Sequence, residues 1–330
     1  MLKNMIRATL VGAALALIPA TAMAAEVTLK IAHIAPPTSS FQINAERFGK
    51  HLREISGGTM DVEIVPGGAL GNLVQLWAQL QAGSLDMHII DIGAILPMKE
   101  ARHFFIITMP YLFRDQEHLH VFLESDIFKG MMAEVETATG IKFIGPMGDR
   151  PPRALSTRET IVMTPADMKG MKIRTPLNPA ITEVFKAWGT SPTPVKGSEL
   201  YQSLQSGLVD GQENGIDAVV QAGLTEVQKY FIRTNYIHSA IGLWISGTRW
   251  NSLSSEQQDW IMQAAEAASA EANAAFPNEV EAMFAEAEAK GMIIVDPDIA
   301  AFKAAGRPIV EAWDGKRWPA GMYDQINAMK

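Results

Sequence analysis

Hydrophobic and polar residues alternate in two short segments near the start of the chain, residues 27–32 and 60–65. A period of two is typical of β-strands with one buried face. Between these segments, apolar residues recur every three or four positions, which predicts a helix that ends at Gly57 and Gly58. The recurring residues are Phe41, Ala45, Phe48 and Leu52.

A second strand and helix follow directly. Another helical stripe of apolar residues ends at Gly83, and the mainly apolar run 87–92 comes next. Such a run indicates a strand that is buried on both faces. Strands that alternate with helices predict an α/β fold with a largely parallel sheet covered by helices. The stripe consists of Leu73, Leu76, Trp77 and Leu80.

The same alternation returns in the middle of the chain. Prolines at Pro151-Pro152, and again at Pro176 and Pro179, interrupt the order and are places where we expect the chain to pass between two lobes. No low-complexity linker marks a boundary, so we expect several crossings. The predicted strands are residues 141–145, 172–175 and 208–212, and the predicted helices are residues 179–187 and 197–205.

Residues 255–290 are rich in alanine, glutamate and glutamine, a composition that favours helices. Apolar residues form one stripe along this segment, as in a helix packed on a core. Because proline disrupts a helix interior, we expect long helices broken near Pro277. The stripe includes Trp260, Ile261, Ala264 and Ala268.

The first 24 residues have the layout of a secretory signal peptide. Basic residues precede the apolar run 8–20, and the small-residue ending Ala22-Met23-Ala24 predicts cleavage after Ala24. The apolar run is shorter than the roughly 20 residues of a membrane span, and no later run is long enough. The mature chain is therefore expected to be soluble, with an uncleaved N-terminal anchor as the alternative.

Composition narrows the classes of partner. The chain has no cysteine, so thiol chemistry is excluded, and 48% hydrophobic residues suffice to build a core. A formal net charge of −8 argues against nucleic acid or an anionic membrane as partner. It does not exclude an anionic ligand, because nearby donors outweigh charges that salt screens over roughly 8 to 10 Å.

Arg174 ends the predicted strand 172–175, and ligands of open α/β sheets usually bind at strand ends. Its planar guanidinium can make two parallel hydrogen bonds to a carboxylate. Other short motifs surround it in a fixed order. They are P-A-D-M-K-G-M-K-I-R from Pro165, S-P-T-P from Ser191, E-L-Y-Q-S-L-Q-S-G from Glu199 and V-D-G-Q-E-N ending at Asn214.

In this order and spacing, the motifs closely resemble the DctP-like solute-binding proteins of tripartite ATP-independent periplasmic (TRAP) transporters, which collect organic acids. M-P-Y-L-F-R-D, starting at Met109, extends the resemblance over nearly the whole mature chain. The resemblance implies a two-lobe periplasmic-binding-protein fold with chain crossovers and long C-terminal helices that brace both lobes. Residues 25–150 are expected mainly in lobe 1, residues 151–250 mainly in lobe 2, and residues 251–330 in the bracing helices.

The resemblance also implies a function. The protein is expected to be a periplasmic receptor, and not an enzyme, whose cleft closes around a small organic carboxylate, a sugar acid or a C4-dicarboxylate. Its expected partners are the small and large integral-membrane subunits of the transporter. No cofactor or metal is expected, and we expect a monomer.

In the resembled family, the arginine of the K-I-R motif is the main carboxylate anchor, which places this role on Arg174. A second basic group comes from an R-x-x-[ST] segment, matched by Arg153 and Ser156. Arg150 competes with Arg153 for this role, because it fits the spacing from the preceding glycine whereas Arg153 fits the distance to Arg174. If both reached the ligand, the ligand would carry two acid groups or an acid with several hydroxyls.

Two further polar residues match family positions. Asn214 can donate to and accept from a ligand at once. Family members usually follow this asparagine with proline, whereas this chain has Gly215. Asp91 matches an acid that accepts from a ligand hydroxyl or ammonium, and a structural role is the alternative. Glu213 is expected to bond to the backbone or cap the next helix.

Aromatic residues near the predicted cleft are candidates for its walls, because ligand pockets combine an apolar lining with a few polar groups. Most aromatics at such spacings are core residues instead. The candidates are Phe41, Trp188, Tyr236 and Trp244.

The remaining motifs give little indication of function. The glycine turn at residues 66–71 lacks the G-x-G-x-x-G spacing of a nucleotide site, and we interpret it as an entry into a helix. His118 and His120 are expected to face solvent, because no metal-binding pattern includes them. No G-x-S-x-G motif is present. A periplasmic lyase or hydrolase acting on sugar acids is the alternative function.

Overall fold

The computed structural model describes residues 25–95 and 99–330, so the expected signal peptide lies outside the described residues. The strands are β1 (Val27–Ala32), β2 (Met60–Val65), β3 (Met87–Asp91), β4 (Ile141–Thr157), β5 (Lys172–Thr175), β6 (Ser191–Pro194), β7 (Gly211–Asn214), β8 (Tyr230–Ser246) and β9 (Ile293–Val295). The helices are α1 (Ser40–Ile55), α2 (Leu73–Ala82), α3 (Gln116–Glu124), α4 (Asp126–Thr139), α5 (Pro179–Ala187), α6 (Leu200–Gln205), α7 (Ile216–Gln221), α8 (Gly247–Ser252), α9 (Ser255–Ala289), α10 (Ile299–Trp313) and α11 (Met322–Asn327).

The strands pair in the order β2-β1-β3-β8-β4-β7-β5-β6, with β9 beside β8. The α/β fold is confirmed, but the sheet is mixed. The flanking pairs are parallel, whereas β8 runs antiparallel to β3 and β4, and β4 runs antiparallel to β7. The expectation of a largely parallel sheet was therefore wrong for the centre of the sheet.

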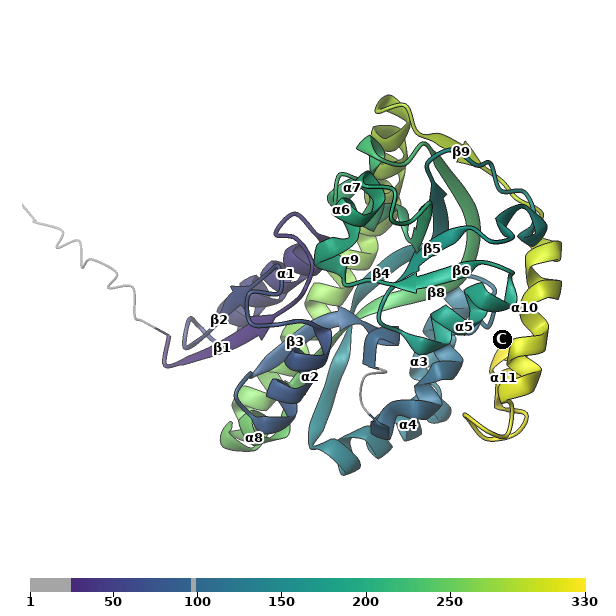
Figure 1. Ribbon diagram of the computed structural model, residues 1–330. Coiled ribbons are helices and arrows are strands. Elements are labelled where there is room, and N and C mark those ends of the chain that lie inside the picture. The colour runs from purple at the N-terminus through teal and green to yellow at the C-terminus, as the bar shows by residue number, and fades with distance from the viewer. Residues whose placement is uncertain (1–24, 96–98) are drawn as a thin grey trace, which may run out of the picture.

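β4 and β8 are the crossing strands of the molecule. Each spans 17 residues, and together they link the two halves of the sheet, because β8 pairs with β3 and β4 pairs with β7. Figure 1 shows them between the group of β1, β2 and α1 and the group of β5, β6 and α5. The sequence predicted only the first part of β4 and missed β8. The domain boundaries expected from the sequence remain a prediction.

Prolines explain part of this difference. Pro151 and Pro152 lie inside β4, although proline in a central strand removes a ladder hydrogen bond. The register of β4 against β8 shifts between Arg150 and Arg153, so these prolines occupy an irregular stretch of the ladder. Proline is tolerated at such a bulge.

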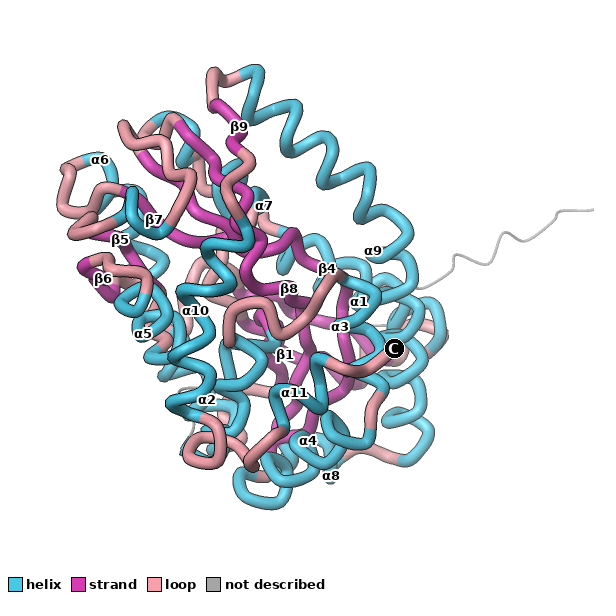
Figure 2. Tube along the Cα trace, turned by 90° about the vertical axis from the view of Figure 1, so that its right-hand side faces the viewer, coloured by secondary structure: helices cyan, strands magenta, loops and turns pink. Residues whose placement is uncertain are grey.

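The helix α9 spans 35 residues and includes Pro277, so the expected break near this proline is wrong. Figure 2 shows α9 passing β4 and α1 on its way to β9. Its alanines at positions 264, 265, 268 and 272 are buried. We attribute the unbroken helix to this packing, which offsets the cost of about 3 kcal/mol for an interior proline.

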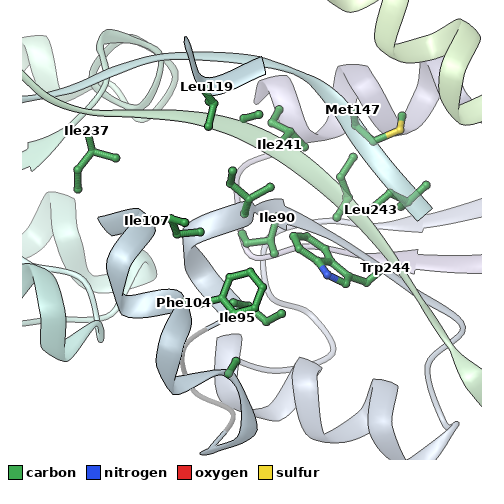
Figure 3. Close-up of a cluster of buried hydrophobic side chains, with 14 of the residues drawn as sticks. Ile90, Ile95, Phe104, Ile107, Leu119, Met147, Ile237, Ile241, Leu243 and Trp244 are labelled. Atoms are coloured by element: carbon green, nitrogen blue, oxygen red, sulfur yellow. The ribbon is translucent and has the colours of Figure 1, made fainter. Parts of the chain in front are cut away.

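The central strands also carry the largest part of the core. Side chains from β3 and β8 pack with those of the segment before α3, as Figure 3 shows. A second, smaller cluster lies among α6, α7 and the end of α9. The crossing strands are thus supported at both ends by packed side chains. The labelled residues of the larger cluster include Ile90, Phe104, Ile107, Ile241, Leu243 and Trp244.

Candidate functional site

An irregularity in β4 brings two arginines to the same side of the sheet. Arg150 pairs with Ser239 of β8, and Arg153 pairs with Ile237. Three residues apart in a regular strand, the two side chains would point to opposite faces. Their partners are two residues apart and share a face, so the extra residue in β4 acts as a bulge that re-aims one arginine. Both arginines therefore point to one site.

Arg150 is buried and makes four hydrogen bonds to polar side chains. Its Nη1 donates to Asp91 Oδ2 at 2.5 Å, its Nε and Nη2 donate to Asp217 Oδ2 at 3.1 and 2.8 Å, and Nη2 also donates to Asn214 Oδ1 at 3.2 Å. The guanidinium also lies 5.1 Å from the ring centre of Phe41, within range of a cation–π contact. Burial lowers the pKa of Arg150, but the two carboxylates outweigh this effect and raise it above its usual value.

Arg153 forms a two-pronged ion pair inside the protein. Its Nε and Nη2 donate to the two oxygens of Glu213 at 2.8 and 2.6 Å. The hydroxyl of Tyr236 donates to the same carboxylate at 2.5 Å. Burial lowers the pKa of Arg153, but the charge of Glu213 more than offsets it and raises the pKa well above its usual value.

Arg174 differs from both. It is 4% exposed, and its Nε donates to the carbonyl of Val195 at 2.9 Å. Among residues 25–95 and 99–330, no carboxylate forms a salt bridge with it and no group accepts from its terminal nitrogens. Burial therefore lowers the pKa of Arg174 to about 10, with only a partial offset from the more distant Glu213. The guanidinium remains charged at neutral pH.

Asp91, the last residue of β3, contacts Arg150 from the far side of β8. Its Oδ1 accepts from Ser239 Oγ and from the backbone N–H of Gly93, both at 2.8 Å. Burial raises its pKa, but the nearby positive charges, with Arg150 first, outweigh burial and lower the pKa below its usual value. Since these partners occupy most of its lone pairs, the geometry favours the structural role that the sequence left open.

The structure thus places the predicted polar residues around one site. Arg174 pairs with Gln212 of β7, and the charges of Glu213 and Arg153 both act on the pKa of Arg174, so the three charged groups lie near one another. The sequence treated Arg150 and Arg153 as competitors for one role, yet both are buried at the site. Glu213 was expected to bond to the backbone or to cap the next helix, but its carboxylate instead forms an ion pair with Arg153.

Asp217 was missed altogether. It lies in the first turn of α7, where an acid ordinarily stabilises the helix N-terminus, so its position in the sequence indicated only a helix start. The sequence contained one weak indication that Asp217 belongs to the site. It follows Asn214, a predicted ligand residue, by three positions and lies in the first turn of the next helix.

The aromatic candidates divide between two places. Phe41 lies over Arg150, and Tyr236 contacts the site through Glu213. Trp188 packs edge-on against Tyr236, with ring centres 5.3 Å apart. Trp244 instead lies in the core of Figure 3, and its ring centre is 5.1 Å from that of Trp77.

Two other sequence expectations have clear outcomes. His118 does not face solvent, because it is 2% exposed and its Nε2 lies 2.9 Å from the carbonyl of Ile326. The glycine turn does lead into a helix, α2. Its amides at Gly67 and Gly68 donate to backbone carbonyls, at 2.8 and 3.0 Å, which leaves them unavailable to a phosphate.

Gly215 has a packing role beside Asn214. Its φ of −70° would suit proline, yet a Cβ would lie 2.5 Å from Asp217 Oδ1 and 2.8 Å from the carbonyl oxygen of Pro151. Glycine therefore lets the carboxylate of Asp217 approach the backbone of β4, where it reaches Arg150.

We expect Gly215→Ala to destabilise the protein by about 1 to 3 kcal/mol, because the added carbon overpacks this contact. The measurement is the midpoint of urea unfolding. Gly130→Ala is the control, because a Cβ added there would have no described atom within 4 Å, and it sits within α4, where alanine is favoured by up to about 1 kcal/mol. Equal midpoints for the two variants would show that Gly215 has no such packing role.

Solved structures of other proteins share this fold. A TRAP periplasmic solute-binding protein of Bordetella bronchispeptica, with density assigned to pantoate, is 30% identical with a TM-score of 0.85, covering 92% of this chain and 99% of its own. A protein of the same type from Polaromonas, bound to D-erythronate, is 26% identical with a TM-score of 0.85 and the same coverage. A third from Roseobacter denitrificans, with bound L-galactonate, is 32% identical with a TM-score of 0.79, covering 88% and 95% of the two chains.

Fold and sequence together define the class of protein as a solute-binding protein of the TRAP type, which confirms the resemblance drawn from the motifs. Residues 31–316 match the model of the bacterial extracellular solute-binding protein family 7, and the chain belongs to this family. Over the described ranges 25–95 and 99–330, no helix combines the length and the apolar character needed to span a membrane.

Proposed function

We propose that this protein binds a small organic acid in the periplasm, with Arg174 as the carboxylate anchor, and delivers it to TRAP membrane subunits. The observation that carries the proposal is the contrast among the arginines. Arg150 and Arg153 are neutralised by internal carboxylates, whereas Arg174 is buried without one in the described part of the chain. A buried cation of this kind is costly unless an anion pairs with it.

Asn214 and the aromatic residues complete the proposed site. Asn214 is half-buried and its Oδ1 is held by Arg150, which orients its amide nitrogen as a donor to a ligand oxygen. Phe41 and Tyr236 supply apolar surface beside the arginines. The acids seen in the relatives, pantoate, D-erythronate and L-galactonate, support a hydroxylated acid as the ligand.

A thermal-shift screen across organic acids tests the proposal. A ligand at 100 times its dissociation constant stabilises the folded state by about 2.7 kcal/mol, which is readily measured. We expect sugar acids to raise the melting temperature and neutral sugars of the same length to leave it unchanged. A screen in which no acid has an effect would contradict the proposal.

The receptor and enzyme hypotheses predict different fates for the acid. We expect saturable binding and recovery of the acid with its mass unchanged, because the proposed site binds and releases without chemistry. Mass spectrometry of the acid after long incubation with excess protein measures this. Accumulation of a dehydrated or cleaved product would favour the lyase or hydrolase alternative.

A further inference from the structure

We infer that this site accepts an acid with one carboxylate and rejects a dicarboxylate, and that Glu213 and Asp217 set this selectivity by neutralising the neighbouring arginines. The inference rests on the proposed function and concerns the number of ligand carboxylates that the site can bind. It narrows the ligand to a hydroxylated monocarboxylate.

The charges around the site are balanced before any ligand binds. Three arginines face three carboxylates: Arg150 contacts Asp91 and Asp217, and Arg153 contacts Glu213 and lies 3.9 Å from Asp91. Arg174 has no carboxylate of its own among the described residues. One ligand carboxylate can therefore pair directly with a cation that lacks a counter-ion, and a second one cannot.

The hydrogen bonds lead to the same conclusion. Four N–H···O contacts of Arg150 already go to Asp91, Asp217 and Asn214. A second ligand carboxylate could make two parallel hydrogen bonds to Arg150 only by displacing a protein acceptor, because these contacts leave one N–H, on Nη1. A displaced protein carboxylate would stay buried and unpaired. Leaving a buried charge without a partner is strongly unfavourable.

Glu213 disfavours pairing of a second ligand carboxylate with Arg153. The carboxylate of Glu213 is fully buried, and both of its oxygens are engaged by Arg153, with Tyr236 on one of them. Two carboxylates sharing one guanidinium in a buried site repel each other. The far end of the ligand should therefore carry hydroxyls, for which neutral donors such as the amide of Asn214 suffice.

Matched acids test this selectivity. D-erythronate and meso-tartrate differ only in the terminal group, a CH₂OH against a carboxylate, and L-galactonate and galactarate form a second such pair. By isothermal titration calorimetry on the mature protein, we expect each dicarboxylate to bind at least tenfold more weakly than its monocarboxylate partner. Tighter or equal binding of the dicarboxylates overturns the inference but leaves the proposed function standing. If none of the four acids binds, and no acid raises the melting temperature in the thermal-shift screen, the proposed function itself is contradicted.

A charge-neutral variant tests the role of Glu213. Glu213→Gln removes the counter-ion of Arg153, and we expect the affinity ratio of dicarboxylate to monocarboxylate to rise at least tenfold. Asp210→Asn is the matched control, because it removes the same charge three positions earlier, where the side chain is exposed and accepts from the backbone of Lys172. An unchanged ratio in Glu213→Gln overturns the assigned role.

Asp217→Asn provides a second variant if Glu213→Gln does not fold. Within the described residues Asp217 Oδ1 has no hydrogen-bond partner, so an amide nitrogen can take its place while the amide oxygen keeps the bonds from Arg150. Circular dichroism confirms the fold before titration. The same shift in ratio is expected, and its absence in a folded Asp217→Asn protein also counts against the inference.

Discussion

Replacing Arg174 with alanine is expected to weaken binding of the acid by tenfold to a thousandfold or more. Removing one partner of a buried charge pair typically costs about 2 to 5 kcal/mol, much of it because the remaining charge is left unpaired. The loss should fall on the ligand and not on the protein, because Arg174 forms no internal salt bridge among the described residues. Calorimetry with the best acid of the screen measures the change.

Two further variants separate geometry from charge. Arg174→Lys keeps the charge but cannot make the paired hydrogen bonds of a guanidinium, so its affinity should fall between wild type and Arg174→Ala. Lys172→Ala, at an exposed position of the same strand, should bind as wild type. Wild-type affinity in Arg174→Ala would remove Arg174 from the site.

Arg150→Met is expected to destabilise the protein by about 3 to 5 kcal/mol. The change leaves Asp91 and Asp217 buried with no guanidinium between them, and breaking a buried ion pair from one side has this typical cost. The variant should therefore unfold at a much lower urea concentration, whether or not an acid is present.

The matched controls use the same side-chain change. Arg233→Met removes an arginine from an exposed pair with Asp296, and such pairs are worth about 0 to 1 kcal/mol. Adding Asp217→Asn to Arg150→Met should restore part of the stability, because it removes one of the two stranded charges. Equal stability of Arg150→Met and Arg233→Met would show that the ion pairs of Arg150 do not hold the crossing strands together.

Local elements could be predicted well from the sequence. The bounds of β1, β2, β5 and α5 agree with those expected. β1 and β2 alternate apolar and polar residues, β2 and β5 each end directly before a proline, and α5 begins after the cap Asn178. Gly83, for example, ends α2 in the left-handed conformation at φ 75°. Short-range periodicity suffices where neighbouring residues alone determine the element.

The crossing strands could not be predicted in the same way. β8 is buried along most of its length, so its side chains show no alternation, and β4 contains prolines that ordinarily exclude a central strand. Both strands exist because each pairs with partners more than 50 residues away in sequence, such as Arg150 with Ser239. A pattern read along the chain does not contain that pairing.

The geometry of the site also depends on contacts between distant segments, so the sequence alone could not predict it. The motifs identified the arginines and Asn214, but the bulge that turns Arg150 and Arg153 to one side depends on the pairing with β8. Whether an arginine is available to a ligand depends on which acids reach it in three dimensions. Glu213 and Asp217 decide this, and their positions in the sequence suggested only backbone contacts and a helix start.

The central claim is that Arg174 alone among the three arginines pairs with the ligand. A crystal structure of the mature protein grown with L-galactonate, or with the acid that gives the largest thermal shift, tests it most directly. We expect one carboxylate against both terminal nitrogens of Arg174, with N···O distances of about 2.7 to 2.9 Å, while Glu213 stays on Arg153. A carboxylate bound instead by Arg150 or Arg153, with a protein acid displaced, would contradict the account.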